Sequence, residues 1–123
     1  MRFSHINIKA PLPALHKEKE FCCAILGFTE GFRPDFSSKG YWLYYENEPL
    51  IHLTEGECEA TQSQNGGFIN HVAFFKENKD AFITLLKEKK IPYSSTHVSE
   101  TKSTQVKLLS PLQVSYEIIF NDT

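Results

Sequence analysis

Residues 3–9 read FSHINIK and residues 69–75 read INHVAFF, and these two stretches decide the fold that we expect. In the first stretch polar and apolar side chains alternate, which is typical of a β-strand with one face in the core. The second stretch has the same length and is rich in β-prone residues. Because the second stretch restarts the pattern of the first, the sequence indicates an internal duplication, with one similar module in each half of the chain.

The first half continues with a helix and three more strands. Pro11 and Pro13 end the first strand and suit the first turn of a helix, which we expect over Leu15–Leu26 with Gly27 as its C-terminal cap. Further strands are expected at Phe28–Phe32, Tyr41–Tyr45 and Leu50–Thr54. The first half therefore reads as strand, helix, strand, strand, strand.

The second half repeats this order. After the strand at residues 69–75, Asn78 can cap a helix that runs to about Lys90. Strands are then expected near Tyr93, at Gln105–Leu109 and at Ser115–Phe120. We predict an α+β fold of two βαβββ modules that form a curled, incomplete mixed β-barrel with outer helices. The expected organisation is one domain, 1–123, with module one at about 1–55, a polar linker at 55–67 and module two at about 68–121.

Composition excludes several classes of protein. The chain has 123 residues, of which 41% are hydrophobic and 23% are charged, which is ordinary usage for a globular domain. The formal net charge of −2 gives no electrostatic reason to expect nucleic acid or an anionic membrane as partner. No apolar run approaches the roughly 20 residues that span a bilayer.

The N-terminus and the cysteines indicate a cytoplasmic protein. The opening MRFSHINIKA lacks the apolar core of a signal peptide. The cysteines are three in number, with Cys22 and Cys23 adjacent on the expected helix and Cys58 in a polar loop. An odd count without CxxC spacing is neither a disulfide framework nor a zinc-finger pattern, so we expect reduced thiols.

Four residues recur at matching places in the two halves. His5 and His52 are 47 positions apart, and His71 and Glu117 are 46 positions apart. The last strand of each half thus carries a candidate metal ligand at nearly the same offset from the histidine of the first strand. An approximate twofold axis between the halves would bring two such pairs together. Two other histidines, His16 on a polar helix face and His97 in an expected loop, are interpreted as exposed.

Three imidazoles and one carboxylate suit one borderline divalent ion per site. Zinc, nickel, cobalt, manganese and iron(II) accept this ligand set, whereas calcium and magnesium prefer all-oxygen sites. If all four residues bind, water or substrate fills the remaining positions. If only His5 or His52 joins His71 and Glu117, the set becomes two histidines and one carboxylate.

The chain resembles the vicinal oxygen chelate superfamily, which includes glyoxalase I, extradiol dioxygenases, methylmalonyl-CoA epimerase, and fosfomycin- and bleomycin-resistance proteins. The segments that carry the resemblance are FSHINIKA, AILGF, GYWLYY followed by PLIHL, NHVAFF and YEIIF, in that order over nearly the whole chain. The resemblance implies a glyoxalase-like fold, with His5, His52, His71 and Glu117 at the four metal-ligand positions. The chain departs from the pattern at residues 110–113, where Ser-Pro-Leu-Gln replaces an Asp-Pro-x-Gly turn, and at His52, where glutamate or glutamine is common in the glyoxalase I and epimerase branches.

The implied chemistry is metal-dependent lyase or isomerase activity on a small molecule held through adjacent oxygens. In that reading Glu117 can also serve as a catalytic base if it loosens from the metal. Extradiol dioxygenation with iron(II) and thiol transfer to an antibiotic stay open as other enzymatic readings. The non-enzymatic alternative is a bleomycin-resistance-like protein that sequesters a flat drug or metabolite.

Further side chains are candidates for binding the substrate: Asn7, Arg33, Tyr41, Tyr44, Phe75 and Gln105. The planar guanidinium of Arg33 suits a carboxylate. The aromatic residues, with Trp42 and Tyr45, can line a pocket, although residues of this kind are more often in the core.

We also expect a homodimer. Symmetric dimers are the commonest oligomers, and small members of the superfamily are usually dimeric. The modules can pair within one chain. Alternatively, His5 and His52 of one chain would meet His71 and Glu117 of the other.

Overall fold

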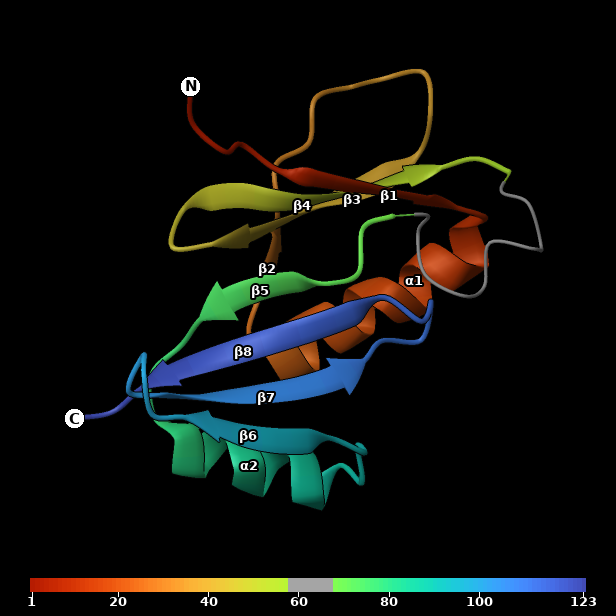
Figure 1. Ribbon diagram of the computed structural model, residues 1–123. Coiled ribbons are helices and arrows are strands. Elements are labelled where there is room, and N and C mark those ends of the chain that lie inside the picture. The colour runs from red at the N-terminus through yellow and green to blue at the C-terminus, as the bar shows by residue number, and fades with distance from the viewer. Residues whose placement is uncertain (58–67) are drawn as a thin grey trace. The chain divides into compact units, whose positions relative to one another are not determined.

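Each half of the chain forms one βαβββ module, which confirms the predicted fold class. The computed structural model describes residues 1–57 and 68–123, and the chain divides into two units, 1–62 and 63–123. Each unit contains a four-stranded mixed sheet and a helix (Figure 1). The expected linker falls mostly on residues 58–67, which lie outside the described residues, as does Cys58.

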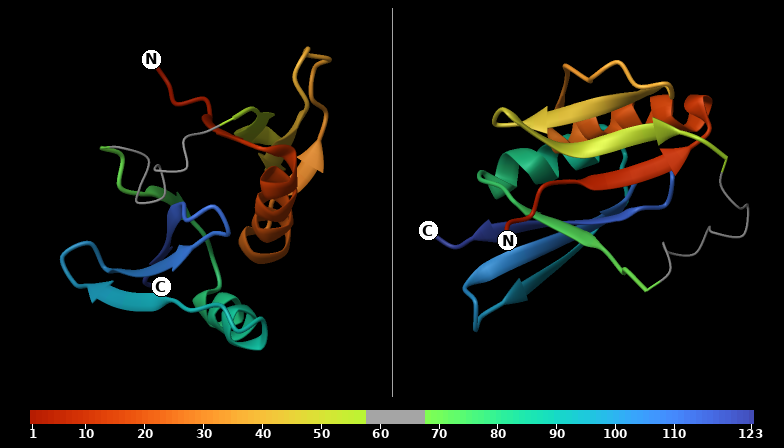
Figure 2. Two further views of the ribbon diagram at one scale, coloured as in Figure 1. Left: turned by 90° about the vertical axis from the view of Figure 1, so that its right-hand side faces the viewer. Right: turned by 90° about the horizontal axis from the view of Figure 1, so that it is seen from above.

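The first unit is built around the sheet β1-β4-β3-β2. Its elements are β1 (Ile6–Ala10), α1 (Leu12–Phe21), a π-helical turn (Cys22–Leu26), β2 (Thr29–Gly31), β3 (Gly40–Tyr45) and β4 (Glu48–Glu55). Strands β1 and β4 run parallel, and the other neighbouring strands run antiparallel. Helix α1 lies along one face of this sheet, and the loop between β2 and β3 rises on the other side (Figures 1 and 2).

The predicted first helix is present and begins earlier than expected. Because proline is tolerated in the first helical turn, α1 starts directly after Pro11 and includes Pro13. The helix widens into the π-helical turn and ends at Gly27, whose φ of 89° is the left-handed cap that the sequence predicts.

The second unit repeats the topology with the sheet β5-β8-β7-β6. Its elements are β5 (Val72–Phe75), α2 (Lys79–Glu88), β6 (Ser94–Val98), β7 (Ser103–Leu109) and β8 (Ser115–Asn121). Strands β5 and β8 are parallel, as β1 and β4 are in the first unit. The predicted cap of α2 is confirmed, since Asn78 Oδ1 accepts a hydrogen bond from the backbone N–H of Ala81 at 3.2 Å.

Two strands start later than expected, and one expected loop is a strand. The ladder of β1 begins at Ile6 and that of β5 at Val72, so His5 and His71 directly precede their strands instead of lying within them. His97 lies in β6 and contacts Asp122 at 3.0 Å; it remains exposed, because β6 is a polar edge strand.

The helix-facing side of each sheet forms the core. In the first unit Leu43, Ile51 and Leu53 are fully buried, as is Leu15 of α1. In the second unit the corresponding buried residues are Val106, Tyr116, Ile118 and Phe120, with Phe82 and Leu86 of α2. Since successive strand residues point to opposite faces, the residues between these positions lie on the face away from the helix. That face carries most of the candidate site residues.

The divergent turn at residues 110–113 forms in spite of its sequence. Ser110 Oγ accepts a hydrogen bond from the backbone N–H of Val114 at 3.1 Å, and the N–H of Gln113 donates to the carbonyl oxygen of Ser110 at 2.8 Å. Gln113 has a φ of 66°, a left-handed conformation that glycine adopts more readily. Ser110 and Gln113 thus take the places of the aspartate and glycine, and β8 begins directly afterwards.

Within residues 1–57 and 68–123, no helix has the length and apolar character needed to cross a membrane. Among the described residues, neither Cys22 nor Cys23 forms a disulfide, and Cys22 is buried.

Candidate functional site

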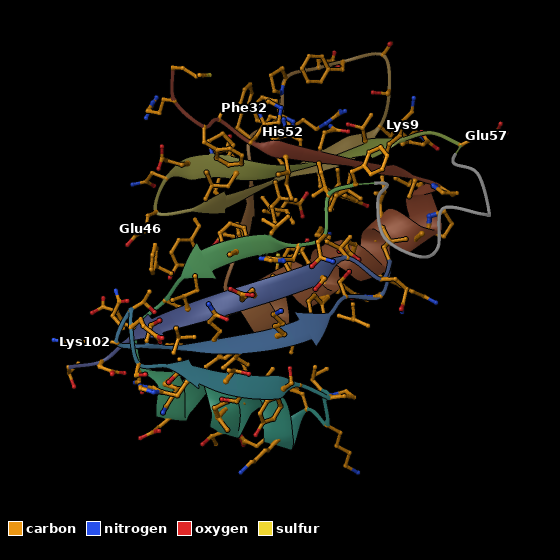
Figure 3. All side chains as sticks on the ribbon, viewed as in Figure 1. Lys9, Phe32, Glu46, His52, Glu57 and Lys102 are labelled. Carbon is orange, nitrogen blue, oxygen red and sulfur yellow. The ribbon has the colours of Figure 1, made fainter. Side chains whose placement is uncertain are left out.

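The register of the first sheet places His52 on the face away from α1. Its cross-strand neighbours are Asn7 on β1 and Trp42 on β3. Figure 3 shows His52 on the same side of the sheet as the segment that carries Phe32, at the start of the loop between β2 and β3. His5, two residues before Asn7, reaches the same face and contacts the His52 ring.

The second sheet holds His71 and Glu117 in equivalent positions. Glu117 on β8 has Ala73 on β5 as its register partner, and His71 stands two residues before Ala73. The parallel strand pair of each module therefore presents its two candidate ligands in one arrangement, with His71 corresponding to His5 and Glu117 to His52. This equivalence is the structural form of the duplication seen in the sequence.

Glu117 is buried and lies close to two cationic or basic groups. It is only 5% exposed. Its Oε2 atom lies 3.6 Å from His71 Nε2 and 3.7 Å from Lys107 Nζ. His71 Nδ1 lies 2.9 Å from Asn70 Oδ1. An amide oxygen can only accept, so Nδ1 carries the proton of a neutral His71 and the lone pair of Nε2 is available beside the carboxylate.

In the first unit three rings form a stack. The centroids of His5 and His52 are 3.7 Å apart with planes 13° from parallel, and Trp42 lies on His52 at 3.9 Å and 11°. An imidazole lone pair lies in the plane of its ring, so two nearly parallel planes do not point their lone pairs at one ion. As they lie, His5 and His52 do not converge on a common metal.

His52 is held in one tautomer. Its Nε2 atom lies 3.1 Å from the carbonyl oxygen of Pro49, which can only accept, so Nε2 carries the proton and the Nδ1 lone pair is available. Burial lowers the pKa of His52 below its ordinary 6.5, and the charges of His5 and Arg33 lower it further, against an opposing effect of the bond to Pro49. At neutral pH His52 is therefore an uncharged ring.

Asn7 and Tyr44 lie on this same face of the first sheet. Asn7 Nδ2 donates to Thr54 Oγ1 at 2.8 Å. The Tyr44 hydroxyl donates to the carbonyl oxygen of Phe32 at 2.6 Å, and its ring lies against Gly31, the register partner of Trp42. Tyr44 thus fastens the start of the loop between β2 and β3 to the sheet.

Tyr41 lies on the opposite, helix-facing side. The Lys19 ammonium sits 4.4 Å from the centre of its ring, and the His16 ring is 6.4 Å away, both from α1. Tyr45 packs on Phe28 at 5.7 Å. The structure therefore places Tyr41 and Tyr45 apart from His52, while Trp42 and Tyr44 lie with it.

Arg33 lies on the His52 side of the sheet, in the loop between β2 and β3. One of its terminal nitrogens donates to the Ser38 carbonyl oxygen at 2.9 Å and the other contacts Ser38 Oγ at 3.3 Å. Its guanidinium lies 5.0 Å from the centre of the Phe36 ring. Within the described part of the chain, no carboxylate pairs with it, Asp35 included.

Phe75 and Gln105 share the Glu117 face of the second sheet. Both have Ile119 as register partner, and Ile119 stands two residues after Glu117. Phe75 is 69% exposed. Lys107, which the sequence analysis missed, is the direct cross-strand partner of Glu117. Because Lys107 stands two residues after Gln105 in β7, the sequence indicates that both lie on the same face. Only the register of β7 on β8 shows that Lys107 lies beside Glu117.

Each module thus contributes a pair of candidate ligands. In the described ranges, 1–57 and 68–123, no group of three or more histidine, cysteine, aspartate or glutamate side chains is placed to hold a metal ion.

The chain has a glyoxalase-like fold of two βαβββ modules, which is the fold that the sequence predicts. No protein-family model matches the chain, and no curated protein matches its sequence.

Solved structures match over nearly the whole chain. A Bacillus anthracis protein assigned to the glyoxalase family matches with a TM-score of 0.79 at 18% identity, over 99% of this chain and 96% of its own. A glyoxalase/bleomycin resistance protein/dioxygenase domain from Frankia sp. EAN1pec gives 0.75 at 13% identity, over 98% and 92%. The E126Q mutant of the fosfomycin resistance protein FosX from Listeria monocytogenes, in complex with Mn(II) and 1S,2S-dihydroxypropylphosphonic acid, gives 0.72 at 16% identity, over 98% and 92%.

Proposed function

We propose that this protein is a divalent-metal-dependent enzyme of the glyoxalase type, a lyase or isomerase acting on a small molecule bound through two adjacent oxygens. His5, His52, His71 and Glu117 are the proposed metal ligands. The observation that carries the proposal is the 3.6 Å separation of His71 Nε2 and Glu117 Oε2 in the second module. In the first module, His5 and His52 occupy the equivalent positions of their own sheet.

The His71–Glu117 pair fits a metal ion. Ligand distances of about 2.0–2.2 Å at tetrahedral to trigonal angles separate the two donor atoms by roughly 3.3–3.8 Å. The contact of Nδ1 with Asn70 supports the fit, because a ligating histidine usually donates its other N–H to an oxygen.

His5 and His52, the pair of the first module, fit a metal ion only in part. His52 has its Nδ1 lone pair available and its Nε2 proton engaged by Pro49, which again is the usual arrangement of a ligating histidine. His5 must turn out of its stack on His52 to join it. His5 is exposed and precedes β1, so no ladder hydrogen bond of the strand opposes this movement.

A bound metal ion would supply Lewis acidity to the two adjacent oxygens of the substrate. The chain's own residues supply the rest. Glu117, once it loosens from the metal, would accept the proton that leaves the carbon next to the polarised carbonyl, and the Lys107 ammonium lies 3.7 Å from this carboxylate. Asn7, Tyr44 and Arg33 are the proposed groups that hold the substrate from the first module, and Phe75 and Gln105 from the second.

A dioxygenase is the second candidate, and the ring stack favours it. If His5 stays stacked, the ligand set reduces to His52, His71 and Glu117, two histidines and one carboxylate. That set leaves positions of iron(II) open for a catechol and dioxygen. We propose a cytoplasmic homodimer in either case, with a small molecule as the substrate.

The proposed function is tested by proton exchange. Hydroxyacetone in D2O would be incubated with protein loaded with zinc, nickel, cobalt or manganese, and loss of its methylene proton signal followed by NMR. We expect exchange with the loaded wild type and a large decrease in Glu117→Gln. Glu100→Gln, the same substitution at an exposed glutamate in the turn between β6 and β7, serves as the matched control. Absence of exchange with every metal, together with oxygen uptake on catechol by the iron(II) form, would replace the isomerase by the dioxygenase.

A further inference from the structure

The guanidinium of Arg33 has no counter-charge among the described residues. Arg33 is half-buried, and in residues 1–57 and 68–123 no carboxylate lies within ion-pairing distance of it. Arginines that are partly removed from water are normally paired, because desolvating an unpaired charge is costly. The position is therefore energetically suited to an anion that the chain itself does not provide.

The place of Arg33 on the sheet connects it with the candidate site. A Cβ added at Gly40 would lie 3.2 Å from Arg33 Nε. Gly40 is the register partner of Thr54, which shares its face with His52. Arg33 Nε therefore lies over the sheet on the face that carries His52.

The side chain is held in position before any ligand binds. Ser38 accepts hydrogen bonds from both terminal nitrogens, through its carbonyl oxygen and through Oγ. Phe36 lies beside the guanidinium, and the Phe36 ring is 6.1 Å from that of Trp42. A fixed guanidinium loses less conformational entropy when it binds a ligand than a free one.

The hydrogen-bonding capacity of Arg33 is not used up. A guanidinium has five N–H groups, and Ser38 takes one from each terminal nitrogen. Arg33 Nε is buried and has no hydrogen-bond partner in the described part of the protein. A buried donor left unpaired is costly, and such donors in native structures call for a partner such as water, an ion or a ligand.

We propose that Arg33 binds an anionic group of the substrate, so that the substrate class is small carboxylates or phosphonates with an adjacent hydroxyl or carbonyl oxygen. This inference rests on the proposed function for the adjacent oxygens, but the anion contact itself needs no metal. Ser38 and Phe36 are the positioning residues of Arg33. The anion accepts hydrogen bonds from the guanidinium and supplies the missing negative charge.

The test uses Trp42, the single tryptophan of the chain, which lies between Phe36 and His52. Full-length protein freed of metal by chelator would be titrated with lactate, methylphosphonate and neutral propane-1,2-diol, with sodium chloride holding the ionic strength constant. We expect a saturable change in Trp42 fluorescence with the two anions and none with the diol. Arg33→Gln should weaken anion binding about tenfold or more, and Arg33→Lys should weaken it less. Arg2→Gln, at an exposed arginine, should leave it unchanged.

Two outcomes would overturn the proposal. Equal affinity of wild type and Arg33→Gln for lactate, with both proteins folded by circular dichroism, would show that Arg33 does not hold the anion. Equal binding of lactate and propane-1,2-diol would show that the site does not select charge. Because no metal is present, either result leaves the metal site untouched, whereas failure of metal binding alone leaves the anion contact standing.

Discussion

His71 Nε2 lies 3.6 Å from Glu117 Oε2, and this contact joins the segment before β5 to strand β8 within one module. The two residues are 46 positions apart in sequence. Their partners in the duplication, His5 and His52, occupy the same places beside β1 and on β4. A buried carboxylate next to an imidazole with an available lone pair suits one half of the metal site that we propose.

Removal of Lys107 should strengthen metal binding. Its ammonium lies 3.7 Å from Glu117 Oε2, where it attracts the carboxylate and repels a cation bound there. A unit charge at this distance near a surface contributes about 1 kcal/mol after screening, so Lys107→Met should lower the zinc dissociation constant roughly fivefold. Isothermal titration calorimetry measures this directly. Lys102→Met, at a lysine in the turn between β6 and β7, serves as the control, and weaker zinc binding by Lys107→Met would contradict the account.

Metal binding should change the fluorescence of Trp42. Trp42 lies on His52 at 3.9 Å, and His52 lies on His5 at 3.7 Å. Both histidines can ligate one ion only after the stack opens, which alters the surroundings of the indole. Titration of metal-free protein with zinc should therefore change the emission up to one equivalent. Zinc binding at one equivalent without any change in emission would mean that the stack persists and that His5 is not a ligand.

Replacement of Gln113 by glycine should stabilise the protein. Gln113 has a φ of 66° in the turn that precedes β8, and a side chain there costs about 1–2 kcal/mol. Glycine also gives the unfolded chain more conformational freedom, which opposes this gain by about 0.4–1 kcal/mol. The net increase in unfolding free energy should therefore be about 0.5–1 kcal/mol. Urea denaturation measures it. The same substitution in a strand, Gln105→Gly, should instead destabilise, and a loss of stability in Gln113→Gly would show that the turn is not strained.

The Lys19–Glu30 ion pair should stabilise the first module up to high pH. Lys19 Nζ lies 3.1 Å from Glu30 Oε1, and Lys19 is 18% exposed. The hydrogen bond to Glu30 raises the pKa of Lys19 above 10.5, so its stabilisation is present below 10.5 and is lost as the pH rises through the raised value.

We expect Lys19→Met to lower the unfolding free energy at pH 7 by about 1 kcal/mol. Lys17→Met, at an exposed lysine of the same helix, should have almost no effect. The difference between wild type and Lys19→Met should shrink above pH 10.5. A difference that is the same at pH 7 and pH 11 would exclude the ion pair as its source.

Much of the fold was predictable because the duplication constrains both halves at once. The hydrophobic pattern at residues 3–9 and 69–75 defined two modules, and Gly27 and Asn78 marked helix ends by conformations that other residues rarely adopt. The sequence predicts starts of β1 and β5 that are too early. The residues before each strand continue its alternation of polar and apolar side chains, and only the backbone hydrogen bonds show where strand pairing begins.

The site was less predictable, because its contacts depend on register. Lys107 meets Glu117 only through the pairing of β7 on β8, which no local pattern specifies. By residue type, Tyr41 and Tyr44 are both candidates for the substrate pocket. Tyr41 stands two residues before the buried Leu43, however, so the two share the face of β3 that packs on the helix. The ring stack on His52 also could not be foreseen, since it depends on side-chain rotamers.

The measurement that tests the central claim most directly is elemental analysis of untagged protein purified without chelator, as metal per chain for wild type, His71→Ala and His16→Ala. His16 is exposed on α1, where it contacts Glu20 and Tyr41, so it is the matched control. The account predicts close to one equivalent of zinc, nickel, cobalt, manganese or iron in wild type and His16→Ala, and a large loss in His71→Ala. No metal in the wild type after reloading with each ion, or equal metal in all three proteins, would contradict it.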